Sequence, residues 1–99
     1  MQLDERNILN VLHKAEFADA HWFQLGQQLR LKRPALLTIG ANRRDDPRLC
    51  MCDVISWWLN NDLSKSWEKL ATAVENTDQY GLVNGNTVRQ EAGIRRFDR

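Results

Sequence analysis

The side chains that could perform chemistry in this chain are two cysteines, two histidines and thirteen carboxylates. Cys50 and Cys52 are two residues apart, so on a helix their side chains point about 200° from each other and cannot form a disulfide. His13 and His21 fall on different expected helices. Zinc sites need about four convergent ligands, usually in paired C-x-x-C or H-x-x-x-H spacings, and the chain has neither pairing. The sequence therefore predicts no metal site.

Enzymatic activity is also disfavoured by the distribution of these groups. Catalysis by carboxylates needs two acids that face one cleft, and a small helical bundle seldom holds such a cleft. We therefore expect no activity and no cofactor. In this interpretation Cys50 belongs to the core, Cys52 is a surface thiol, and both histidines are solvated.

Composition is that of an ordinary soluble globular protein. The chain has 99 residues, 42% hydrophobic and 27% charged, with a net charge of +1. This length fits one domain, expected over residues 1–92, with a flexible tail over 93–99. No apolar run approaches the roughly 18 residues of a membrane span, and the first ten residues lack a secretory pattern. Free thiols and the absence of a glycosylation sequon favour the cytoplasm.

Apolar residues recur at helical spacing along most of the chain, which predicts an all-α fold. Helix starts are expected after Asp4, after Asp19, at Pro34, at Asp46-Pro47 and at Ser66, because acids, serine and proline favour these positions. The segment 81–92 is ambiguous. Its glycines each cost a helix about 1 kcal/mol, and Asn84-Gly85 is a hairpin signal. With no other strand to pair, a sixth helix is the preferred prediction.

Four tryptophans mark the expected core and one expected surface. Trp22, Trp58 and Trp67 lie on the inward faces of three helices and should share one core. Trp57 falls at the edge of its helix's apolar stripe. It is expected either as an exposed contact for another chain or as partly buried against its own loop, under Leu63.

The order of these signals resembles the death domain. The motifs that carry the resemblance are "WFQLGQQL", "LLTIGAN", "CDVISWWL" and "SWEKLATAV", within residues 8–88. The resemblance, closest to divergent death domains of invertebrate receptors and adaptors, implies a six-helix antiparallel Greek-key bundle without an active site. It also implies homotypic assembly that recruits caspases or kinases. By position it assigns eight residues to the core: Trp22, Leu25, Leu29, Ile39, Val54, Trp58, Trp67 and Leu70.

Charged residues and two surplus aromatics are the interface candidates. The expected basic face follows the second and third helices, and the expected acidic face lies on the first and fourth. Unlike faces on one molecule suit head-to-tail contact, which produces rings or open polymers. Tryptophan and arginine are also common in interface hot spots. The candidates are Glu16, Phe23, Arg30, Lys32, Arg33, Arg43, Arg44, Asp53, Trp57 and Asp62.

Two other interpretations of the basic residues stay open. They could solubilise the surface, or they could belong to a small helical DNA-binding domain of the helix-turn-helix kind. Asp45 and Asp46 directly follow the second basic pair, and the candidate recognition helix offers only Thr38 and Asn42 to bases. We therefore expect a cytoplasmic homotypic interaction module in apoptosis or innate immunity. Its expected partners are itself and other death-fold domains, with no membrane or nucleic acid.

Overall fold

The computed structural model describes residues 2–77 and 81–93, and for residues 81–84 only the backbone. In this part of the chain the fold is all-helical, with six α-helices and no strand, which confirms the predicted fold class. None of these helices is both long and apolar enough to cross a membrane. The predicted tail lies outside the described residues, except for Gly93. The helices are α1 (Glu5–Lys14), α2 (Trp22–Gln28), α3 (Arg33–Asn42), α4 (Pro47–Asn61), α5 (Trp67–Glu75) and α6 (Gly81–Ala92).

Three helices begin where side-chain caps were predicted. Asp4, Asp46 and Ser66 each accept a hydrogen bond from a backbone N–H two or three residues later, at 2.8–3.2 Å. Pro47 follows Asp46 at the first helical position, where its missing N–H leaves no bond unmade. The expected cap at Asp19 is wrong. Asp19 begins a short 3₁₀ turn, Asp19–His21, and α2 starts after it without a side-chain cap.

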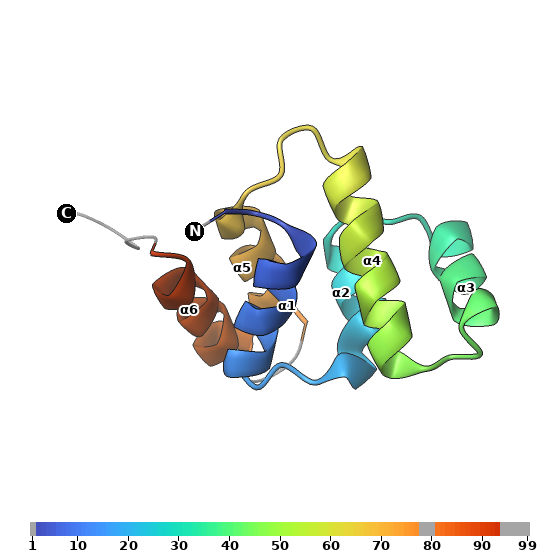
Figure 1. The fold of residues 1–99 in the computed structure, drawn as a ribbon, viewed down its shortest axis with the longest axis horizontal. Helices are drawn as coiled ribbons and strands as arrows, with labels where there is room; N and C mark the ends of the chain where they lie inside the picture. The colour runs from blue at the N-terminus through green and yellow to red at the C-terminus, as the bar shows by residue number, and fades with distance from the viewer. Residues whose placement is uncertain (1, 78–80, 94–99) are drawn as a thin grey trace.

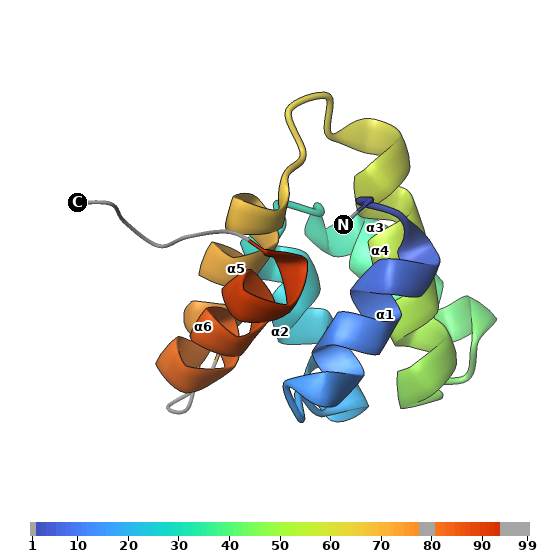
Figure 2. The same cartoon turned by 60° about the vertical axis from the view of Figure 1, so that its left-hand side comes forward.

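Successive helices run in alternating directions (Figures 1 and 2). The longest, α4, packs against α1, α2 and α3, whereas α3 contacts only α2 and α4 among the helices of the described residues. On the other side of the bundle α5 and α6 lie side by side, and α6 also contacts α1. As a result α3 lies at one edge of the molecule and α6 at the other (Figure 1).

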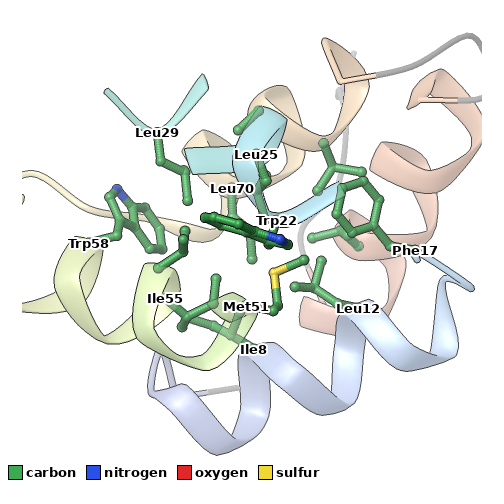
Figure 3. Packing of buried hydrophobic residues seen from close by; sticks show 14 of the residues in the cluster. Ile8, Leu12, Phe17, Trp22, Leu25, Leu29, Met51, Ile55, Trp58 and Leu70 are labelled. Atoms are coloured by element: carbon green, nitrogen blue, oxygen red, sulfur yellow. The ribbon is translucent and has the colours of Figure 1, made fainter. Parts of the chain in front are cut away.

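The core fills the space between α1, α2, α4 and α5. All eight residues that were assigned to it by position are buried. Trp22 lies in the middle of the cluster, with Met51 on one side and Leu25 and Leu70 on the other (Figure 3). Trp58 and Trp67 belong to the same buried cluster. The indole N–H of Trp58 donates to the Asp62 carboxylate at 2.9 Å, so this tryptophan is buried with its polar atom satisfied.

The sixth helix forms because its glycine permits close packing. A Cβ at Gly85 would overlap the Glu75 side chain and lie 2.9 Å from the backbone oxygen of Ala71. Glycine therefore allows α6 to approach α5 more closely than any other residue would. Arg89 then secures the contact: it is 5% exposed and pairs with Glu68 at 2.7 Å and with Glu75. The helix prediction for 81–92 is confirmed, and the hairpin alternative is wrong.

Candidate interaction surfaces

A hollow that we call the tryptophan groove lies where α2, α4 and α5 meet. It consists of two adjoining parts of about 390 and 460 Å³ that share Leu29, Arg30, Asp62 and Lys69 in their walls. Trp57 lines one part and Trp58 the other. Its walls combine apolar residues with two cations, Arg30 and Lys69, and two carboxylates, Asp62 and Glu68.

A larger hollow, the α1–α4 groove, lies between the C-terminal half of α1 and the beginning of α4. Its volume is about 780 Å³. Leu9, Leu12 and Phe17 supply apolar walls, and Glu16 and Asp19 supply two carboxylates. The wall also carries Asn10, His13, Ala18, Arg48 and Cys52.

These two grooves lie at opposite ends of α4. Arg48 and Cys52, in the first turns of α4, line the α1–α4 groove, while Asn61, its last residue, lines the tryptophan groove. A helix of 15 residues spans about 22 Å. The described residues therefore form a hollow near each end of α4, and the walls of both carry charges of either sign.

The two surplus aromatics are less exposed than expected. Trp57 is half-buried and packs against the core cluster, so the prediction of an exposed indole is wrong. It does not lie under Leu63, whose side chain is 97% exposed. Phe23 is also half-buried, edge-to-face with Trp22 at a ring distance of 5.4 Å. Both residues extend the core toward the surface, where Trp57 forms part of a groove wall.

Asp62 stabilises the loop after α4, and its carboxylate is bonded within the chain. Its carboxylate accepts hydrogen bonds from the Ser64 backbone N–H at 2.9 Å and from the Trp58 indole at 2.9 Å, and it pairs with Lys69 at 3.3 Å. These donors, above all the Ser64 N–H, lower the pKa of Asp62 to about 2. The carboxylate is therefore ionised at neutral pH, and its bonds are made within the chain.

Arg43 and Asp53 were expected on opposite faces and are found paired with each other. The guanidinium donates to both carboxylate oxygens, from Nε at 2.7 Å and from the terminal nitrogen at 3.1 Å. The cause is the short α3–α4 turn, which folds Arg43 back against the second turn of α4. The carboxylate raises the pKa of the Arg43 guanidinium above its ordinary value. Asp53 therefore already has a partner within the chain.

The expected basic cluster is divided in two. Arg30, Lys32 and Arg33 are exposed where α2 joins α3, while Arg43 and Arg44 lie at the far end of α3. A ten-residue helix separates the two groups by about 15 Å. Glu16 is exposed, as expected of an interface acid.

Three leucines on the surface were missed in the sequence interpretation. Leu63 is 97% exposed, Leu37 54% and Leu49 43%. Leu63 has only polar neighbours in the α4–α5 loop, and this pattern could have indicated from the sequence that its side chain is exposed. The three leucines lie on three different segments, and apolar side chains scattered singly over a surface are normal.

The groups considered for chemistry lie apart or are inert. Burial raises the pKa of both thiols, so Cys50 and Cys52 remain protonated at neutral pH. Cys52 is half-buried and not a surface thiol, and His21 is half-buried with its ring 5.7 Å from that of Phe17. Across residues 2–77 and 81–93, no three His, Cys, Asp or Glu side chains gather in a way that could hold a metal ion. Comparisons with protein-family models, curated proteins and solved structures found no match.

Proposed function

We propose that this chain is a homotypic protein–protein interaction module that associates head-to-tail. The observation that carries the proposal is the pair of unlike grooves at opposite ends of α4, one that includes Glu16 and Asp19 and the other Arg30 and Lys69. A contact between two different surfaces does not close on itself as a two-fold contact does. It can therefore be repeated from copy to copy.

The biological setting follows from the resemblance of the sequence to death domains. Six antiparallel helices agree with the helix number of that fold, and we propose the Greek-key order of the death fold for them. By this resemblance the module belongs to the cytoplasm. Its oligomers would recruit signalling partners, with death folds of their own, in apoptosis or innate immunity.

Fewer charged residues support the head-to-tail arrangement than the sequence indicated. Asp53 and Asp62 are engaged within the chain, so Glu16 and Asp19 remain as the acidic side. Arg30, Lys32 and Arg33 remain as the basic side, at the α2–α3 junction. Charges at the rim of a contact set its orientation and speed more than its strength. Association should therefore weaken or slow as salt is added.

Light scattering of the purified chain against concentration tests this function, with duplex DNA as the competing partner. We expect the mean mass to rise with protein concentration and to be unaffected by DNA. The hydroxyl of Thr38, a residue that would face bases in a DNA-binding domain, donates to the Pro34 carbonyl at 2.9 Å within α3. Binding of duplex DNA with a steep salt dependence would replace the proposal.

A further inference from the structure

The serine and threonine hydroxyls of the chain differ in how easily a second protein could reach them. Of the seven, the exposed ones are Thr38, Ser64 and Thr72. Thr38 and Thr72 lie within α3 and α5, and the Thr38 hydroxyl donates to the Pro34 carbonyl at 2.9 Å. Ser64 lies in the α4–α5 loop, which projects from the bundle (Figures 1 and 2). It is therefore the one exposed hydroxyl among these seven that no helix holds.

A lysine ammonium contacts the Ser64 hydroxyl. Lys69 Nζ donates to Ser64 Oγ at 2.6 Å, and it also pairs with the Asp62 carboxylate at 3.3 Å. Lys69 is in the first turn of α5, so the helix keeps its backbone beside the loop. Asp62 accepts a hydrogen bond from the Ser64 backbone N–H at 2.9 Å, which holds the loop at this point. An anionic group added to Ser64 Oγ would thus meet a cation that the fold already supplies.

We propose that Ser64 is phosphorylated by a protein serine kinase that uses ATP, and that Lys69 then binds the phosphate. In this reaction Ser64 Oγ forms a bond to the γ-phosphorus, the bond from that phosphorus to the bridging oxygen breaks, and ADP leaves. The hydroxyl proton passes to the catalytic base of the kinase. An exposed loop suits this reaction because the acceptor oxygen must come into line with the leaving oxygen. The proposal goes beyond self-association, since it requires no second copy of the chain.

Phosphorylation changes the wall of the tryptophan groove, which Asp62 and Lys69 line. The phosphate carries about 1.5–2 negative charges at neutral pH. Asp62 is ionised there too, because the Ser64 N–H and its other donors lower its pKa to about 2, so the two anions compete for Lys69. We expect Lys69 to move from the carboxylate to the phosphate, which carries more charge. The groove then loses part of its positive charge.

Mass spectrometry tests the acceptor, after incubation of the full chain with ATP and a panel of purified serine/threonine kinases. We expect phosphate on Ser64 and its loss in Ser64→Ala. Thr72→Val is the matched control: it removes an exposed hydroxyl from a helix and should be phosphorylated as fast as the wild type. If no kinase modifies Ser64, or if Thr38 or Thr72 is modified equally fast in the folded chain, the proposal is wrong.

Phosphorus NMR of the chain with phosphoserine at position 64 tests the role of Lys69. The pKa of an ordinary phosphoserine is about 6. A cation in contact favours the doubly charged form, so Lys69→Met should raise the phosphate pKa by about half a unit or more. Lys65→Met is the matched control, because the Lys65 ammonium donates to the Asp62 carbonyl at 3.5 Å, and it should change the phosphate pKa less. The same phosphate pKa with and without Lys69 would overturn the proposed binding of the phosphate.

Discussion

Replacing Gly85 by alanine sets helix propensity against packing, and the structure decides which effect is larger. Alanine favours an isolated helix over glycine by about 1 kcal/mol. In the bundle, however, the new Cβ would overlap the Glu75 side chain and meet the Ala71 backbone oxygen, which cannot rotate away. Overpacking of this kind costs about 1–3 kcal/mol. Displacing Glu75 also weakens its pairing with Arg89, worth about 1.5–3 kcal/mol for a bond to a charged group.

The sum predicts that Gly85→Ala destabilises the fold by about 1.5–5 kcal/mol. For a domain of this size, each kcal/mol lowers Tm by about 4–8 °C. Thermal and urea unfolding measure the change. Gln90→Ala is the control, because Gln90 is exposed on the same helix and its replacement should leave Tm nearly unchanged. A Tm for Gly85→Ala equal to or above that of the wild type would refute the close packing of α5 and α6.

Trp58→Ala should lower the free energy of unfolding by about 3–5 kcal/mol, because Trp58 is 1% exposed and bonded to Asp62; an unchanged urea midpoint would contradict this. Trp57→Ala should cost only about 1 kcal/mol, since the side chain is half-buried, and should weaken self-association measured by light scattering. If the variant unfolds instead, Trp57 belongs to the core alone. The folded-state pKa of Asp62, about 2 against an ordinary 3.8, means that its carboxylate stabilises the fold fully above about pH 4 and loses this effect as the pH falls through 2. The difference in urea midpoint between wild type and Asp62→Asn should therefore shrink over that range, and a constant difference would contradict the assignment.

Features set by neighbouring residues could be predicted from the sequence. Asp46-Pro47 and Ser66 specify helix starts because a cap needs only the next three backbone N–H groups. The buried face of α4 follows from the helical period alone and contains the residues expected there, including Val54 and Trp58. The core residues could be predicted from the sequence for the same reason.

Features set by tertiary contacts could not be predicted. The Arg43–Asp53 pair depends on how sharply the chain turns between α3 and α4, which no local pattern specifies. The burial of Arg89 depends on acids of another helix, and the close approach of α5 at Gly85 is a contact between helices that the sequence does not specify. The residue types of the candidate surfaces could be recognised in the sequence. Which of them line the same groove depends on the fold and could not be predicted. Glu16 and Arg30 were candidates by charge only.

Sedimentation equilibrium of the wild-type chain tests the central claim of head-to-tail self-association most directly. Measured from micromolar to millimolar concentration, the mean mass should rise without levelling at a dimer, because a contact between unlike ends leaves a free end on every oligomer. Added salt should reduce this rise, and duplex DNA should not change it. A mass that stays at that of the monomer throughout, or that levels at a closed dimer, would contradict the account.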